Sequence, residues 1–190
     1  FSLARLNKNL GNTVSRSLMM QSQCFFSTPS SPKTGILMMN LGGPKKSEDA
    51  AQFMYNMFTD PQTVPIFKKV PRFIIRKFCE RRANKSVKAK YDEIGGGTPL
   101  YSWTEKQGAA MCDKLDQISP ETGPHKSYIA FRYSRPNVND AVEKAISDGV
   151  ENLVGFSQYP QYSCSTTNSS IQEFHKSIEK ANPSNINISC

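Results

Sequence analysis

Three short apolar runs, separated by helical patterns, constrain the fold of this chain more than any other feature of its sequence. The runs cover residues 35–41 and 153–156, which are nearly continuous, and 127–133, where apolar and polar residues alternate. Between the first two, Met111, Leu115 and Ile118 recur at helical spacing behind Thr104, a residue type that can cap a helix. Strands that alternate with helices predict an α/β fold with a parallel sheet flanked by helices.

The net charge of +8 is unevenly distributed along the 190 residues. Residues 1–47 hold six basic residues and no acid, and residues 66–90 hold ten basic residues and one acid, Glu80. The rest of the chain is acidic. Such an asymmetry predicts a targeting tail and a local surface for anionic partners, rather than a uniformly basic protein.

The N-terminal segment differs in composition from the rest of the sequence. Residues 1–31 are basic, rich in serine and free of acids, which is typical of a mitochondrial transit peptide, with a disordered tail as the alternative. We predict one domain over 33–182 and a short tail over 183–190. Because the chain begins with Phe1 rather than Met and an apolar run starts near Cys190, we expect a fragment of a longer protein.

Five cysteines without a CxxC pair argue against a secreted disulfide scaffold and favour a reducing compartment. No apolar run approaches the roughly 20 residues that a membrane-spanning helix needs. The segment 61–92 is interrupted by prolines at its start and then predicts a basic amphipathic helix. Its mixture of Phe, Ile, Lys and Arg favours a lipid interface, with nucleic acid, an anionic substrate and a solvated face as alternatives.

Two glycine-rich loops are candidates for close approach to a ligand. Asn40–Pro44 follows the first apolar run, and Gly95–Thr98 follows a helical pattern. The first loop matches neither the dinucleotide nor the P-loop motif, so a plain turn competes with a flavodoxin-like phosphate or nucleotide site. The second loop is either a flexible linker or a ligand contact.

Arg132 and Tyr133 end the second apolar run, where a parallel sheet presents ligand-binding loops. An arginine there can bind a carboxylate with two parallel hydrogen bonds, and a tyrosine can stack on a flat ligand. Cys164 lies in the loop after the third run and is a candidate iron ligand, although a lone cysteine is more often an ordinary thiol. On spacing alone, a surface Arg and a half-buried Tyr remain the simpler interpretation.

Four ordered motifs together resemble the ferrochelatase family over residues 33–176. They are Asn40-Leu41-Gly42-Gly43-Pro44, Gly95-Gly96-Gly97-Thr98-Pro99, Phe131-Arg132-Tyr133 and the run QYPQYSCSTT over Gln158–Thr167. The resemblance implies a Rossmann-like domain, the first of two such halves with the porphyrin between them. It also implies the last step of haem biosynthesis, in which Fe(II) is inserted into protoporphyrin IX, on the matrix side of the mitochondrial inner membrane.

The resemblance also assigns roles to individual residues. It implies that Leu41, Arg132 and Tyr133 line the inner pocket. It implies porphyrin contacts at Arg82, Tyr91 and Thr98, with Ala83 as the alternative to Arg82 because of one extra residue before Tyr91. Cys164 corresponds to one of the four ligands of a [2Fe–2S] cluster in animal ferrochelatases, and 61–80 to a lip that rests on the inner membrane. A homodimer is implied for the full-length protein, without nucleic-acid binding.

Two parts of the family pattern do not occur in this sequence. The family's catalytic histidine lies in a later Ser-x-His-Ser motif followed by an acidic helix, and the other three cluster cysteines lie near its C-terminus. We therefore predict no catalytic base in this chain and no iron insertion by the chain alone. A truncated, non-catalytic product that binds porphyrin or a membrane is the alternative.

Overall fold

The computed structural model describes residues 31–183 and 185–190. The predicted transit peptide therefore lies outside the described residues, except for Ser31. The helices are α1 (Ala50–Phe58), α2 (Arg72–Arg82), α3 (Lys88–Glu93), α4 (Leu100–Ile118), α5 (Val138–Ser147) and α6 (Ser169–Ala181). The strands are β1 (Thr34–Asn40), β2 (His125–Phe131), β3 (Asn152–Ser157) and β4 (Asn187–Ser189).

The four strands form one parallel sheet in the order β2-β1-β3-β4. The central strand β1 pairs with β2 from Thr34 to Asn40 and with β3 from Thr34 to Met39. This confirms the predicted α/β fold with a parallel sheet. The sheet also extends into the segment that we expected to be a tail, because Asn187–Ser189 pair with Asn152–Val154 as the edge strand β4.

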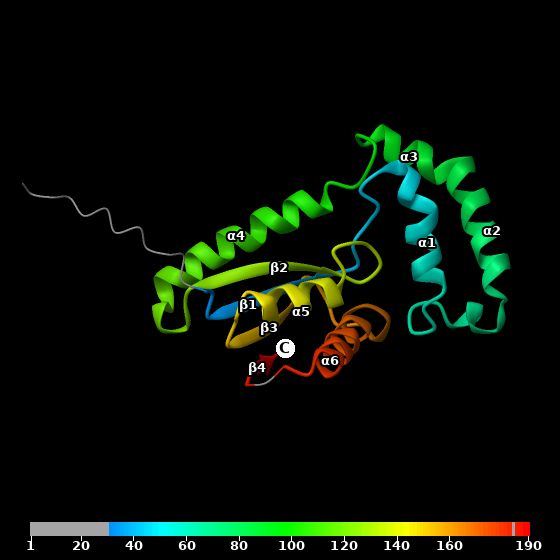
Figure 1. Ribbon diagram of the computed structural model, residues 1–190. Helices are drawn as coiled ribbons and strands as arrows, with labels where there is room; N and C mark the ends of the chain where they lie inside the picture. Colours follow the sequence, from blue (N-terminus) through cyan, green and yellow to red (C-terminus); the bar gives the residue numbers. More distant parts are fainter. Residues whose placement is uncertain (1–30, 184) are drawn as a thin grey trace, which may run out of the picture.

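The sheet lies between helical layers (Figure 1). Side chains of its strands alternate between the two faces. Leu37, Met39 and Leu153 face α5 and α6 and form the larger core with Val142 and Phe174. The opposite face carries Ile36 and Met38, which pack against Cys112, Met111 and Leu115 of α4. The helix that we expected from Thr104 begins earlier, at Leu100, and Thr104 is buried inside it rather than capping it.

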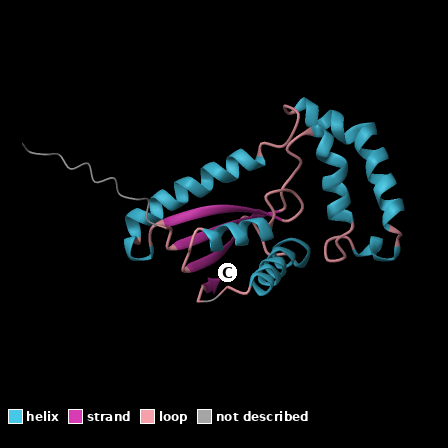
Figure 2. Ribbon diagram, in the orientation of Figure 1, coloured by secondary structure: helices cyan, strands magenta, loops and turns pink. Residues whose placement is uncertain are grey.

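Helices α1, α2 and α3 form an arm beside the sheet, which we call the helical arm, residues 50–93 (Figures 1 and 2). A π-helical turn, Ala83–Val87, joins α2 to α3, so the predicted basic helix is nearly continuous. The arm has its own small core of Met54, Ile75 and Cys79. Within the described residues, none of the helices has the length and apolar character required to span a bilayer.

Candidate functional site

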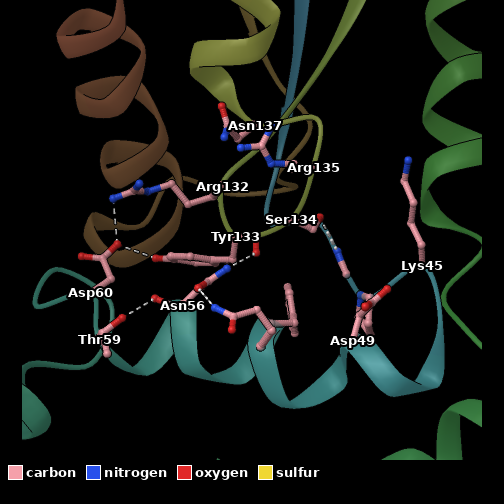
Figure 3. A pocket seen from close by; sticks show the side chains of 14 residues that line it. Lys45, Asp49, Asn56, Thr59, Asp60, Arg132, Tyr133, Ser134, Arg135 and Asn137 are labelled. Atoms are coloured by element: carbon pink, nitrogen blue, oxygen red, sulfur yellow. Dashed lines mark hydrogen bonds and ion pairs between the residues drawn. The ribbon is translucent and has the colours of Figure 1, made fainter. Parts of the chain in front are cut away.

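A cavity of about 750 Å³ lies where the carboxyl ends of β1 and β2 face α1 (Figure 3). Its walls come from the loop after β1, from one side of α1 and from the loop after β2. The lining residues are Gly43, Pro44, Lys45, Asp49, Gln52, Phe53, Asn56, Thr59, Asp60, Arg132, Tyr133, Ser134, Arg135 and Asn137. Open parallel sheets bind ligands at the carboxyl ends of their strands, so the position of this cavity fits a functional site.

The two glycine-rich loops pack against each other at the edge of this cavity. Gly42 has a φ of +82° and lies against Phe131, and the amide of Gly43 donates to Ser134 Oγ at 3.1 Å. A Cβ on Gly97 would lie 2.1 Å from the carbonyl oxygen of Lys45. The Thr98 amide donates to the carbonyl of Pro44 at 3.0 Å. Gly97 of the second loop therefore permits close contact between the two loops, whereas Gly95 and Gly96 have open space at their Cβ positions and positive φ angles.

Arg132 follows the last residue of β2, and its guanidinium binds three polar side chains. Its Nη2 lies 2.7 Å from Asp60 Oδ2, its Nη1 lies 3.2 Å from Glu173 Oε2, and its Nε donates to Ser169 Oγ at 3.0 Å. We expected an arginine that could grip a ligand carboxylate with two parallel hydrogen bonds. The structure differs, because carboxylates of the protein itself occupy both terminal nitrogens. Arg132 therefore shapes the wall of the cavity rather than offering a free anion site.

Tyr133 follows Arg132 and shares the same acceptor. Its hydroxyl donates to Asp60 Oδ2 at 2.6 Å, and its side chain is buried. Burial and the nearby Asp60 carboxylate raise the pKa of Tyr133 to about 12. At neutral pH the phenol therefore keeps its proton and acts as a hydrogen-bond donor.

Asp60 and Asn56 are functional candidates that the sequence reasoning missed. Asp60 lies just after α1, and Asn56, on α1, donates from Nδ2 to the carbonyl of Tyr133 at 3.0 Å (Figure 3). Their partners lie more than 70 residues away in the sequence. No local sequence pattern could have predicted these contacts. An acidic residue directly before Pro61, at the end of a helix, was only a weak signal of a fixed turn.

The other predicted pocket residues lie around the cavity or away from it. Leu41 accepts the Tyr133 amide at its carbonyl at 3.1 Å, and Thr98 packs on Gly43, so both adjoin the lining. Tyr91 lies half-buried on α3, where burial raises the pKa of its phenol. Arg82 is exposed at the end of α2, whereas the alternative Ala83 is buried. The described structure thus brings together Leu41, Thr98, Arg132 and Tyr133, with Arg82 and Tyr91 on the arm.

Cys164 is exposed and begins a π-helical turn in the loop after β3. Over residues 31–183 and 185–190, no group of three or more His, Cys, Asp or Glu residues comes together as metal ligands would. Cys190 approaches His175, with the Sγ–Nε2 distance at 3.7 Å, but this is a separate pair. An iron–sulfur cluster takes four ligands, so these residues alone do not fit one.

Comparison with known proteins gives a consistent result. A family model for ferrochelatase matches residues 33–190. A mitochondrial ferrochelatase of Dictyostelium discoideum is 49% identical over 149 residues, which cover 78% of this chain and 34% of that protein. The mitochondrial ferrochelatase of Homo sapiens is 46% identical over 147 residues, which cover 76% of this chain and 34% of that protein.

The relative from Drosophila melanogaster, also named a mitochondrial ferrochelatase, is 41% identical over 158 residues, covering 82% of this chain and 40% of that protein. The chain thus spans between about a third and two fifths of the length of these curated relatives. The family model covers most of the chain, and the aligned region contains the sheet and the helical arm. This chain belongs to the ferrochelatase family.

Proposed function

We propose that this chain takes part in ferrochelatase activity, the insertion of Fe(II) into protoporphyrin IX, and that it supplies one wall of the porphyrin site. The observation that carries the proposal is the family match over residues 33–190, together with the position of Arg132 and Tyr133 on a cavity at the carboxyl ends of β1 and β2. In this proposal Leu41, Tyr91 and Thr98 contact the macrocycle, and Arg82 meets a propionate.

The chemistry of metal insertion indicates that this wall binds and orients the porphyrin rather than accepting its protons. Metal insertion must remove two pyrrole protons, which requires a base placed near the nitrogens. Tyr133 keeps its own proton at neutral pH, and Asp60 already accepts hydrogen bonds from Arg132, Tyr133 and the Gln62 amide. We therefore propose that the proton acceptor lies outside the residues described, and we expect no iron insertion by the 190-residue chain alone.

The helical arm supports a membrane-associated location. Ile66, Phe73, Ile74 and Phe78 are exposed beside a dense set of lysines and arginines on 66–90. Apolar side chains can enter the lipid while cations meet anionic headgroups, as at amphipathic surface helices. We propose that the arm rests on the matrix side of the mitochondrial inner membrane, consistent with the relatives named mitochondrial. A homodimer remains a prediction, as does the absence of nucleic-acid binding.

The [2Fe–2S] cluster also remains a prediction. Cys164 is accessible and would contribute one of four ligands, so three others would have to come from outside the described residues. Visible absorption of a longer form of the protein that carries the other cysteines, after anaerobic reconstitution with iron and sulfide, checks it. A cluster held by Cys164 gives sulfide-to-iron charge-transfer bands that Cys164→Ser removes.

Porphyrin binding tests the proposed function. Trp103 is the only tryptophan, and it is exposed on α4 near Thr98, so its fluorescence should be quenched when protoporphyrin IX binds. We expect saturable quenching by the purified chain that Arg132→Ala weakens by about tenfold. Lys114→Ala, on the outer surface of α4, is the matched control and should leave the affinity unchanged. A folded chain without saturable quenching, or with equal effects of the two variants, would contradict the proposal.

A further inference from the structure

The turn between α1 and the 3-10 helix Pro65–Lys69 places one carboxylate against both residues of the Arg132–Tyr133 pair. Asp60 Oδ2 accepts from Arg132 Nη2 at 2.7 Å and from the Tyr133 hydroxyl at 2.6 Å. The Asp60 and Arg132 side chains are only 9% and 13% exposed. Because both side chains are largely shielded from solvent, water competes little with their charge-assisted hydrogen bonds, and the geometry of these bonds is well defined.

We propose that Asp60 is a positioning residue that holds the Arg132 guanidinium and the Tyr133 phenol in the geometry required by the pocket wall. The inference rests on the proposed porphyrin site, because it assigns a role to a residue beneath that site. Asp60 acts through the two side chains that it binds, and it does not itself have to touch the substrate.

Asp60 is itself fixed by its own turn. Its Oδ1 accepts from the Gln62 amide at 2.9 Å, and its carbonyl accepts from the amides of Thr63 and Val64 at 3.2 and 3.0 Å. These bonds close the turn around the carboxylate, as an Asx turn does. These bonds fix the turn that carries the carboxylate. A Glu at position 60 would displace the carboxylate by a methylene group, and an Asn would keep the shape but remove the charge.

The same turn forms hydrogen bonds between the helical arm and the sheet domain. Thr63 Oγ1 donates to the carbonyl of Ser165 at 3.1 Å and also contacts the Tyr133 hydroxyl. Gln62 is hydrogen-bonded to Gln172 on α6. Asp60 thus lies where the arm, β2 and α6 meet, so it couples the position of the arm to that of the pocket wall.

Glu173 is a control for Asp60, because it is a second carboxylate that binds Arg132. It also pairs with Arg132, at 3.2 Å, but it is 26% exposed and makes no hydrogen bond with Tyr133. If Asp60 has a positioning role, substituting it should change the properties of both Arg132 and Tyr133, whereas substituting Glu173 should change those of Arg132 alone. The two carboxylates therefore separate a positioning role from a general need for negative charge beside the arginine.

The test uses the full 190-residue chain and needs no porphyrin for its first measurement. Asp60→Asn removes the charge, Asp60→Glu keeps it but displaces it by a methylene group, and Glu173→Gln is the matched control. NMR of chains labelled on tyrosine and arginine reports the pKa of Tyr133 and the exchange rate of the Arg132 Nε proton. Circular dichroism checks that each variant is folded.

We expect both Asp60 variants to lower the pKa of Tyr133 and to speed Arg132 proton exchange by about tenfold. Glu173→Gln should leave the pKa of Tyr133 unchanged and alter Arg132 exchange by less than about threefold. Should Asp60→Asn not fold, Asp60→Glu decides. Wild-type values of both quantities in Asp60→Glu would overturn the inference, as would an equal effect of Glu173→Gln on Tyr133.

Porphyrin titration of the same variants connects the inference to the proposed function. We expect about tenfold weaker binding for Asp60→Asn and Asp60→Glu and less than about threefold for Glu173→Gln. If the wild-type chain does not bind porphyrin while the NMR differences are present, the positioning role stands and the proposed function fails. If porphyrin binds with wild-type affinity to a chain with a displaced Asp60 carboxylate, the positioning role fails and the proposed function stands.

Discussion

Gly97 is the residue at which the two glycine-rich loops come closest. A Cβ there would meet the carbonyl oxygen of Lys45 at 2.1 Å, and a backbone atom cannot rotate away as a side chain can. The neighbouring Gly95 has a positive φ of +102° but has nothing within 4 Å of its Cβ position. Substitutions at Gly97 and Gly95 can therefore distinguish the cost of pushing the two loops apart from the cost of backbone strain.

We expect Gly97→Ala to lower the free energy of unfolding by about 2–3 kcal/mol, because the loops must separate. Gly95→Ala is the control for backbone strain and should cost about 1 kcal/mol. Urea denaturation of the 190-residue chain measures both. Equal costs for the two variants would show that contact with Lys45 is not the reason for glycine at position 97.

Asp148 offers a second test at this scale, through the pH dependence of stability. Hydrogen bonds from Lys126 and Lys144, at 2.7 Å each, together with one from Tyr128, hold the pKa of Asp148 well below its usual range. A carboxylate whose pKa is lower in the folded chain stabilises the fold above its unfolded pKa of about 4, and that contribution is lost as the pH falls further.

Asp148→Asn should therefore lower the free energy of unfolding by about 2 kcal/mol at pH 7, because it removes hydrogen bonds to a charged acceptor. The difference from the wild type should shrink steadily below pH 4. Thermal or urea unfolding between pH 2 and 7 measures this. A difference that does not change with pH would contradict the assignment.

At the scale of elements, the helical arm differs from the layers around the sheet in the side chains that it exposes. Phe73 of α2 is 70% exposed, and Ile66 of the preceding 3-10 helix is 80% exposed. Both lie among the lysines and arginines of 66–90. The buried side of α2, with Ile75 and Cys79, packs against α1, so the exposed apolar side chains are not used in the arm's own core.

The double variant Ile66→Ser, Phe73→Ser should bind vesicles of anionic phospholipid at least about tenfold more weakly, because two apolar side chains no longer enter the lipid. Ile118→Ser is the matched control, since Ile118 is 65% exposed at the end of α4, outside the arm. Vesicle co-sedimentation at low and physiological salt measures the binding. Weakening of the control by the same factor would contradict a membrane role for the arm.

At the scale of the whole molecule, the structure has two unequal cores. The core between the sheet and helices α5 and α6 includes fully buried Leu37, Met39, Leu153 and Phe174, whereas the arm's core is centred on Met54, Ile75 and Cys79. The arm joins the sheet domain through the two loops at residues 41–45 and 95–99 and through the turn at 60–63.

We expect the arm to open more easily than the sheet. Amides of α2 and α3 should exchange with solvent through a local opening whose free energy is lower than that of global unfolding, while amides of β1 should exchange only with global unfolding. Native-state hydrogen exchange at low urea concentrations measures the two values. Equal opening free energies for α2 and β1 would show that the arm and sheet form a single cooperative unit.

Elements with local sequence signals could be predicted before the structure. The run at 35–41 became β1, which is buried along nearly its whole length and therefore needs a continuous apolar run. The runs at 127–133 and 153–156 marked β2 and β3, whose residues are partly buried, and β2 lies two residues earlier than predicted. The basic helix and the position of Arg132 and Tyr133 at the end of a strand were also predicted correctly. The edge strand β4 was not predicted: the start of an apolar run near Cys190 was noted, but three exposed residues are too few to identify a strand.

Which charged side chains meet depends on the packing of elements that are distant in the sequence. Arg132 was predicted as a candidate ligand-binding residue, but its partners Asp60 and Glu173 are 72 and 41 positions away, one in the turn after α1 and the other on α6. An ion pair of this kind leaves no periodic trace in the sequence, since it depends on how the arm and α6 close against the sheet. The sequence thus determined the framework through burial, whereas the packing of distant elements decided the charge pairing at the candidate site.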